Sequence, residues 1–445
     1  MFDPGVVSFA HGEGLRRPYP EALHNARRSL FDEVNSPVEN YLYRQSFAAL
    51  DVQIAAEFER LGVPGECANN VVIDAGSTRL IYVALSVFLS KGDLVLTGPG
   101  FYHPLAAWCD ALGLELVVVS ANNDDGLRLS RDELDLKLRA RRFGQRALLL
   151  LFNPTLIGAA YSQAHIEQIA EVVSAHGALA IEDVLLDTGD GEAASPAGRL
   201  ARSVAHDQTF TVAGASKQHC LANLRIGWGC GPDALVRLVL ERVCDLAASI
   251  PHVAKAAALG ALAAPPIYRR ANVAEAFRRL RLFDSLIADL DSEIRNITGH
   301  SEPIIRVAYS PQCGHSVLLD FSGFARICGL SGPEVGAMLT RFFLVNAATA
   351  FAPVSSQGIA GPLLRANLVS VGTAFTYPIS REIEEDWPVV WDRSCEERFA
   401  FPFAQAWALI AQTLVERVRP AILGAIRHRT IDGCAQPQLL SRSVQ

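Results

Sequence analysis

The sequence predicts an α/β fold with a large domain, in which helices cover a mainly parallel sheet, and a smaller α+β domain. From about residue 70 to 250, short apolar runs alternate with stretches whose apolar residues recur at helical spacing. The runs are apolar throughout, as expected of parallel strands that are buried on both faces. After about residue 300 the runs alternate more between polar and apolar residues, which is typical of a sheet with one exposed face.

The elements follow in order along the chain. Strands of the large domain are expected at 71–73, 94–96, 114–119, 147–152, 178–181 and 209–212. Helices between them are expected at 78–90, 103–112 and 163–175. A long charged helix at 276–290 leads to strands at 304–307 and 316–321, an insertion at 378–400 and a closing helix at 402–428. This predicts an N-terminal arm with part of the small domain (1–45), a large domain (46–280), a small C-terminal domain (281–430) and a tail (431–445).

Composition excludes several classes of protein. The net charge of −7 comes from 40 basic and 47 acidic residues that form no basic stripe, so no nucleic-acid partner is expected. The chain has no run of about 18 apolar residues and no signal peptide, so no membrane span is expected. The nine cysteines are scattered without a CxxC pair, which favours reduced thiols in the cytoplasm and predicts no metal site.

Only four lysines can supply a side-chain primary amine, namely Lys91, Lys137, Lys217 and Lys255. Lys217 stands out because it follows an expected strand, in the segment A-G-A-S-K-Q-H-C-L-A-N-L-R-I-G-W at 213–228. A lysine in such a loop of small residues can form an imine with a carbonyl cofactor. Arg225, eight residues later, can bind a phosphate dianion in bidentate fashion. The alternative is a surface lysine and a structural arginine.

This segment resembles the S-K-x-x-x-x-x-G-L-R-x-G stretch of the class I and II aminotransferases, pyridoxal-phosphate (PLP) enzymes of fold type I. The resemblance extends, in order, over roughly residues 5 to 375. It implies the PLP transferase fold, with a seven-stranded type of sheet in the large domain. It also implies that Lys217 holds PLP as an imine, with Ser216 and Arg225 as cofactor-binding residues.

Two further segments resemble family motifs at strand ends. The segment H-G-A-L-A-I-E-D-V at 176–184 contains Asp183, which lies 34 residues before Lys217. The resemblance implies that Asp183 pairs with the pyridine nitrogen and keeps it protonated, whereas a helix cap is the alternative. The segment D-A-G-S-T-R at 74–79 opens an expected helix, and its backbone amides and hydroxyls suit a phosphate. The implied contacts are Gly76, Ser77 and Thr78, and an ordinary N-cap is the alternative.

Two motifs bear on the cofactor ring. The run from Lys91 to Tyr102 resembles the family's G-D-x-V-x-x-x-x-P-x-aromatic pattern, which implies that Phe101 stacks on the pyridine ring. Core packing is the other explanation for this phenylalanine. The segment F-N-P-T-L-I-G at 152–158 resembles a degraded N-P-x-N-P-T-G motif. The contact to the phenolic oxygen falls on Asn153 by chemistry or on Thr155 by counting back along the chain.

The remaining implied contacts concern the substrate and a second subunit. Arg365, in L-L-R-A-N-L-V at 363–369, matches the family arginine that binds the substrate α-carboxylate. Gly12 resembles the glycine beside that carboxylate, although a plain turn glycine is equally compatible. Tyr41, with Tyr43 as the alternative, matches the tyrosine that reaches the phosphate of the partner subunit. The resemblance therefore implies a homodimer with shared active sites.

Several family residues are replaced, and the replacements indicate a specialised enzyme, for example of secondary metabolism. Leu186 stands in place of a tyrosine, Gly214 in place of a serine and Asn223 in place of a glycine. The expected function is transamination of an α-amino acid with PLP as cofactor. The alternatives are elimination, replacement or cyclisation, as in 1-aminocyclopropane-1-carboxylate synthase acting on S-adenosylmethionine, or a catalytically silent PLP-fold module. Retention of Lys217 and Asp183, together with both arginines, argues against the silent module.

Overall fold

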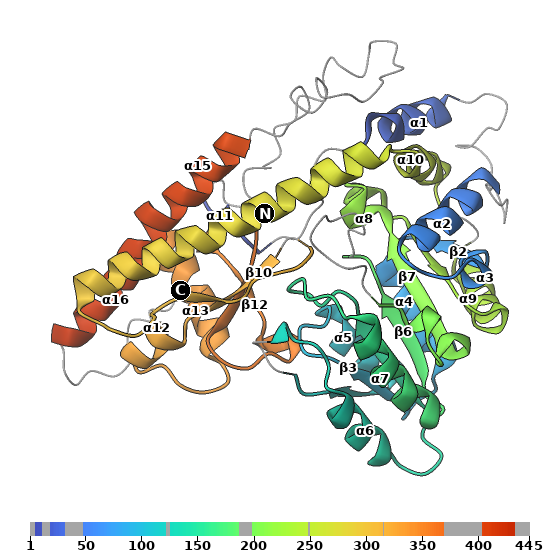
Figure 1. Ribbon diagram of the computed structural model, residues 1–445, viewed down its shortest axis with the longest axis horizontal. Coiled ribbons are helices and arrows are strands. Elements are labelled where there is room, and N and C mark those ends of the chain that lie inside the picture. The colour runs from blue at the N-terminus through green and yellow to red at the C-terminus, as the bar shows by residue number, and fades with distance from the viewer. Residues whose placement is uncertain are drawn as a thin grey trace.

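A computed structural model describes residues 5–10, 18–31, 48–121, 125–186, 198–247, 250–314, 316–368 and 403–431. Two units, each built around its own sheet, lie beside one another (Figure 1). The long helix α11 (Pro266–Thr298) runs from the first unit along the second (Figure 1). Among the described residues, no helix combines the length and the apolar content that crossing a membrane requires.

The first unit contains a seven-stranded sheet. Its spatial order is β2 (Val71–Asp74), β8 (Gly227–Cys230), β7 (Thr209–Gly214), β6 (Leu179–Asp183), β5 (Ala147–Phe152), β3 (Leu94–Thr97) and β4 (Glu115–Val118). Only β8 runs antiparallel to its neighbours. The six strands predicted from the sequence are confirmed within a residue or two. The prediction missed β8, whose sequence G-W-G-C carries two glycines and no run of β-branched residues.

Helices cover both faces of this sheet, which explains why its strands are apolar throughout. In β5, Leu148 and Leu150 join the apolar cluster under α4 and α9, whereas Leu149 and Leu151 join the cluster under α6 and α7. The helices of this unit are α2 (Ala48–Arg60), α3 (Gly65–Ala68), α4 (Ser77–Phe88), α5 (Pro104–Leu112), α6 (Arg131–Arg139), α7 (Gln163–Ala175), α9 (Asp233–Leu246) and α10 (His252–Leu262). Short 3-10 turns lie at Leu200–Arg202 and His206–Gln208.

The described N-terminal residues contribute to both units. Strand β1 (Val7–Ser8) pairs in parallel with β11 (Thr349–Ala350) of the second unit. Helix α1 (Pro20–Leu30) instead packs on α10 of the first unit, beside α2. At Gly260 a Cβ atom would lie 2.4 Å from the carbonyl oxygen of Glu21, so only glycine allows these two helices to approach so closely.

The second unit has a four-stranded antiparallel sheet. Its order is β12 (Ala352–Pro353), β13 (Leu363–Asn367), β10 (Ser316–Asp320) and β9 (Arg306–Tyr309). Helices α12 (Ser322–Ile327), α13 (Val335–Ala347), α15 (Phe403–Thr413) and α16 (Arg419–Ile431) complete it, with a π-helical turn at Leu414–Val418 and a 3-10 turn at Ser355–Gln357. Side chains of α11, including Phe283 and Ile287, share its apolar core.

Two elements of the second unit differ from the prediction. The expected strand at 304–307 begins only at Arg306, because the backbone N–H groups of Ile304 and Ile305 donate to Oδ1 of Asp291 (2.7 and 3.0 Å) instead of to a strand. The helix expected at 276–290 is longer and ends before Gly299, which adopts φ +75°. The insertion at 378–400 lies outside the described residues. The boundaries of the predicted domains stay predictions.

Candidate active site

Lys217 and Asp183 meet at one edge of the large sheet. Strands β5, β6 and β7 run parallel, and in their register Asp183 lies between Phe152 and Val212 at the carboxyl ends. Helix α8 (Ala215–Gln218), which carries Lys217, begins directly after β7. Burial raises the pKa of Asp183 to about 6, while the N–H of Leu185 and the charge of Lys217 oppose this rise. The structure thus brings together an amine and a buried carboxyl group.

An anion-binding arrangement lies at the start of α4. Gly76 (φ +94°) precedes this helix, and Ser77 is buried in its first turn beside the half-buried Thr78. The guanidinium group of Arg225 lies over Gly76, since a Cβ atom there would be 2.7 Å from Nη2 of Arg225. Arg225 itself has φ +50° and donates from Nη1 to the carbonyl oxygen of Ala222 (2.8 Å) in the 3-10 turn Ala222–Leu224. A helix N-terminus beside a guanidinium group suits a phosphate.

Phe101 lies in the apolar core at the junction of the two units. Its side chain is buried, and a Cβ atom at Gly358 would lie 3.3 Å from its Cε1 atom. The neighbouring Gly100 donates its backbone N–H to the carbonyl oxygen of Gln357 (2.7 Å). These contacts fit the core-packing alternative, and the stacking role of Phe101 stays a prediction.

Asn153 and Thr155 are both held by hydrogen bonds within the protein. Nδ2 of Asn153 donates to Oε1 of Glu182 (2.7 Å) and to the carbonyl oxygen of Gly198 (2.6 Å). The hydroxyl of Thr155 donates to the carbonyl oxygen of Gly126 (2.7 Å). Because both amide hydrogens of Asn153 have acceptors, contact with a phenolic oxygen would require one of these bonds to be exchanged. The choice between the two residues stays a prediction.

Arg365 projects from β13 as a partly buried cation. Its Nη2 donates to the carbonyl oxygen of Ala10 (3.3 Å), and its buried Nε has no hydrogen-bond partner within the described ranges. Burial lowers the pKa of Arg365. A buried guanidinium group with an unused donor is costly unless an anion binds to it. Gly12 and Tyr41, with the alternative Tyr43, lie outside the described residues.

The other lysines do not join this edge of the sheet. Lys91 is exposed in a turn, and Lys137 lies on α6. Lys255 is buried in α10, where burial lowers its pKa and the charge of Asp51 opposes the shift. Ser216, beside Lys217 on α8, is also buried.

The prediction missed a polar cluster that includes Gln218 and His219, the two residues after Lys217. His219 contacts Oε1 of Glu57 through Nε2 (3.2 Å), and Arg60 donates to both carboxylate oxygens of Glu57 (2.9 and 2.7 Å) and to Gln218 (2.9 Å). Burial alone would raise the pKa of Glu57, but hydrogen bonds from Arg60 and His219 hold it well below its ordinary range. The burial of Glu57 could have been predicted from its position on the same face of α2 as the apolar residues Ile54 and Phe58. The cluster ties both residues after Lys217 to α2.

Comparisons with known proteins show which family the chain resembles along its length. Residues 4–305 match the family model described as aminotransferase class I and II. The arginine–pyruvate transaminase AruH of Pseudomonas aeruginosa is 31% identical over 236 residues, which are 52% of this chain and 58% of that protein. An aspartate/prephenate aminotransferase of Cereibacter sphaeroides is 25% identical over 297 residues, 64% of this chain and 70% of that protein. The match to the first of these relatives spans less than two thirds of its length.

Solved structures share the fold. An aspartate aminotransferase of Thermus thermophilus has a TM-score of 0.65 at 22% identity, covering 82% of this chain and 87% of that one. The aromatic aminotransferase of Pyrococcus horikoshii has a TM-score of 0.69 at 18% identity, covering 96% and 98%. The predicted fold class is thereby confirmed. The chain belongs to the class I and II aminotransferase family, the PLP-dependent transferases of fold type I that its sequence resembles.

Proposed function

We propose that the protein is a PLP-dependent aminotransferase that acts on an α-amino acid. The observation that carries this proposal is the meeting of Lys217 with the buried Asp183 at the carboxyl ends of the central strands. Of the four lysines, Lys217 is the one that lies beside Asp183. It follows β7 directly, and Arg225 comes eight residues later in the chain. Family membership supports the same reaction class.

The residues present fit PLP. The start of α4, with the guanidinium group of Arg225 over Gly76, forms a cradle for the phosphate that a side chain at position 76 would fill. Asp183, buried with a raised pKa, can accept a hydrogen bond from a protonated pyridine nitrogen, whose positive charge would favour the carboxylate form. When bound, PLP supplies an electron-accepting ring that stabilises negative charge on the substrate Cα.

Three side chains of this protein act on the substrate and on its proton. The amine of Lys217 would hold the cofactor, and as a free amine it would take the proton from the substrate Cα as a general base. The carboxylate of Asp183 would stabilise a protonated ring nitrogen of the cofactor. The partly buried guanidinium group of Arg365, whose buried Nε has no described partner, pairs with the substrate α-carboxylate. This pair orients the amino acid so that its Cα proton faces Lys217.

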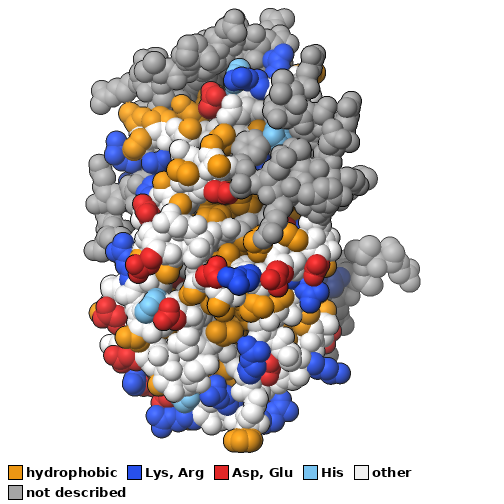
Figure 2. Space-filling model, turned by 90° about the vertical axis from the view of Figure 1, so that its right-hand side faces the viewer, with side chains coloured by type: hydrophobic (Ala, Val, Ile, Leu, Met, Phe, Trp, Pro, Cys, Tyr) orange, Lys and Arg blue, Asp and Glu red, His pale blue; other side chains and the backbone are white. Residues whose placement is uncertain are grey.

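We also propose a homodimer in which Tyr41 of each subunit completes the other active site. Exposed apolar side chains at the end of α1 and on α2 support a buried interface there: Leu30, Phe31 and Val52 are 51%, 75% and 65% exposed. The face shown in Figure 2 carries apolar patches among charges of both signs, with no stripe of one sign. The free thiols of the described cysteines accord with the expected cytoplasmic location.

The experiment combines cofactor mapping with product analysis. PLP-loaded protein is reduced with borohydride and digested, and the phosphopyridoxyl group is expected on the peptide that contains Lys217. Lys217→Ala should lose the label, whereas the control Lys137→Ala on α6 should keep it. A panel of amino acids is then tested for 2-oxo acids and for released leaving groups. A label on another lysine, or leaving groups without 2-oxo acids, would contradict the proposal.

A further inference from the structure

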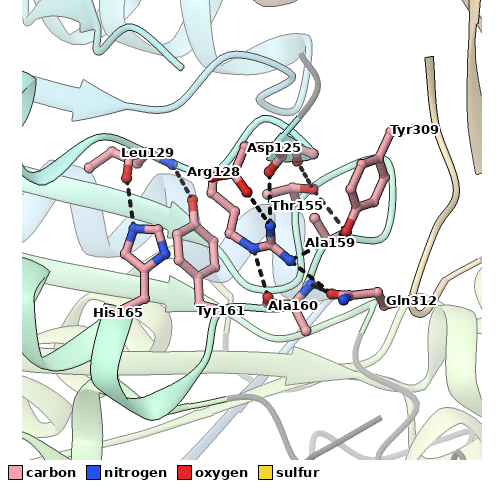
Figure 3. A network of polar contacts seen from close by, with 11 residues as sticks. Asp125, Arg128, Leu129, Thr155, Ala159, Ala160, Tyr161, His165, Tyr309 and Gln312 are labelled. Carbon is pink, nitrogen blue, oxygen red and sulfur yellow. Dashed lines mark hydrogen bonds and ion pairs between the residues drawn. The ribbon is translucent and has the colours of Figure 1, made fainter. Parts of the chain in front are cut away.

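Three loops meet between the two units, at what we term the Arg128 junction (Figure 3). Residues 125–128 follow β4 and residues 155–161 follow β5. Residues 309–313 begin at the last residue of β9 and lie before β10. The first two loops belong to the unit with the large sheet, and the third belongs to the second unit. Figure 3 shows the Arg128 side chain at the centre, directed toward both other loops.

Arg128 uses all five of its N–H donors here. Nη1 donates to the carbonyl oxygen and to Oδ1 of Asp125 (3.0 and 2.7 Å), and Nε donates to the carbonyl oxygen of Ala160 (2.8 Å). Nη2 crosses to the second unit, where Oε1 of Gln312 (2.9 Å) and the hydroxyl of Tyr309 (3.3 Å) accept from it. A planar, fully bonded guanidinium group therefore fixes the mutual orientation of the three loops, which a lysine ammonium could not do.

The loops also approach each other too closely for ordinary side chains. A Cβ atom at Gly158 would lie 1.9 Å from the carbonyl oxygen of Cys313, and one at Gly126 would lie 2.8 Å from Cζ of Tyr309. The carbonyl oxygen of Gly158 accepts from the backbone N–H groups of Gln312 (2.8 Å) and Cys313 (3.0 Å). The contact is thus a built junction with little room for one unit to slide over the other.

Both ends of the junction lie a few residues from the active site. On one side, Thr155 follows the end of β5, where Phe152 pairs with Asp183. On the other side, the loop leads into β10, in which Leu318 pairs directly with Arg365 of β13. An apolar cluster lies between these points and comprises Leu127, Ile157, Leu318, Val354, Ile359 and Leu363. The junction is therefore connected to Arg365 through β10 and to Asp183 through the end of β5, over only a few residues in each case.

The geometry points to Arg128 as a positioning residue that sets the separation between Arg365 and the Lys217–Asp183 edge. This inference rests on the proposed function, because it takes Arg365 as the ligand of the substrate carboxylate. A substrate must place its amine at Lys217 and its carboxylate at Arg365 together, and those groups belong to different units. Loss of the junction lets their separation vary, so the carboxylate should contribute less to binding and orientation.

The test compares two reagents that react with bound PLP and differ in one group. Aminooxyacetate carries a carboxylate, whereas O-methylhydroxylamine does not, so the ratio of their rate constants measures the carboxylate contribution without knowledge of the natural substrate. Absorbance follows both reactions on PLP-loaded protein. Arg128→Met should lower this ratio by about tenfold. The control Arg131→Met removes a half-exposed arginine that pairs with Asp132 (3.0 Å) and should leave the ratio unchanged.

A double variant separates positioning from general loss of structure. Arg365→Met should remove most of the carboxylate preference, and Arg128→Met added to it should lower the ratio by less than about twofold, because both act on one interaction. Equal slowing of both reagents by Arg128→Met would overturn the inference, as would a full multiplicative loss in the double variant. If Arg128→Met does not fold, Gln312→Met, which removes one acceptor on an exposed side chain, should still lower the ratio.

The outcomes also distinguish this inference from the proposed function. If Arg365→Met lowers the ratio but neither junction variant does, the inference is wrong and the carboxylate site stands. If Arg365→Met leaves the ratio unchanged, the carboxylate binds elsewhere, and the proposed role of Arg365 fails together with the inference that rests on it.

Discussion

Asp183→Asn should stabilise the protein without PLP and weaken it with PLP. The rise in the pKa of this buried carboxyl from 3.8 to about 6 corresponds to about 3 kcal/mol against the charged form. Because the folded protein binds this proton more tightly than the unfolded chain does, the contribution to stability is full below pH 3.8 and declines as the pH rises to about 6. At neutral pH the protein carries the whole cost, and an uncharged amide removes it.

The assay measures thermal unfolding of wild type and Asp183→Asn from pH 4 to 8, with and without PLP. Without PLP the variant should gain stability relative to wild type as the pH rises, by up to about 3 kcal/mol. With PLP the order should reverse, since the amide cannot pair with a protonated ring nitrogen. The control Asp132→Asn changes a carboxyl group that is 87% exposed and should not alter the pH dependence. An identical pH dependence of stability for Asp183→Asn and wild type would refute the conclusion that Asp183 is a buried carboxyl group whose charged form is costly.

Other predictions concern single contacts. Arg365→Ala should raise KM for the amino-acid substrate by an amount that corresponds to a loss of about 2–5 kcal/mol of binding free energy. Its kcat should fall less than that of Asp183→Asn. An unchanged KM in steady-state kinetics would contradict the alignment of the second unit. Gly76→Ala should weaken PLP binding by about tenfold or more, because φ is +94° and the new Cβ atom would meet Arg225; equal affinity in a PLP titration would contradict the phosphate cradle. Glu57→Gln should lower Tm at neutral pH and flatten the loss of stability below about pH 4.5, because the folded pKa is depressed and this stability disappears as the pH falls. Light scattering should find a dimer, and Tyr41→Phe should weaken PLP binding; a monomer that binds PLP tightly would argue against shared sites.

Local sequence patterns predicted much of the fold and part of the site. The apolar runs located six strands, because burial on both faces leaves a signal within each strand. The resemblance to the aminotransferases implied that Lys217 and Asp183 act on the same cofactor, and in the structure they lie at the carboxyl ends of neighbouring parallel strands. The start of α4 was predicted from its small residues, and the close contact of Gly76 with Arg225 agrees with that interpretation.

Features that depend on distant partners escaped prediction. Glu57 and His219 are separated by 162 residues, and neither residue type in its own segment signals burial. The link between Arg128 and Gln312 spans 184 residues and joins loops with no motif. Asn153 was favoured for the cofactor because of its chemistry, yet its amide is bonded to Glu182, which the pattern of β6 shows only as one more strand residue. Such contacts arise from tertiary packing.

The scarcity of lysine leaves the surface with almost no primary amines. Nearly all of the 40 basic side chains are arginines, Lys255 is buried in α10, and Lys217 lies in the candidate active site. Arginine stays protonated at any pH that a protein tolerates, so the positive charge of this surface is insensitive to alkaline titration. Among the lysines, amine-directed reagents therefore have few places to react outside the candidate active site, namely Lys91 and Lys137. Acylating labels and aldehyde fixatives would modify this protein sparsely, which makes Lys217 unusually easy to follow chemically.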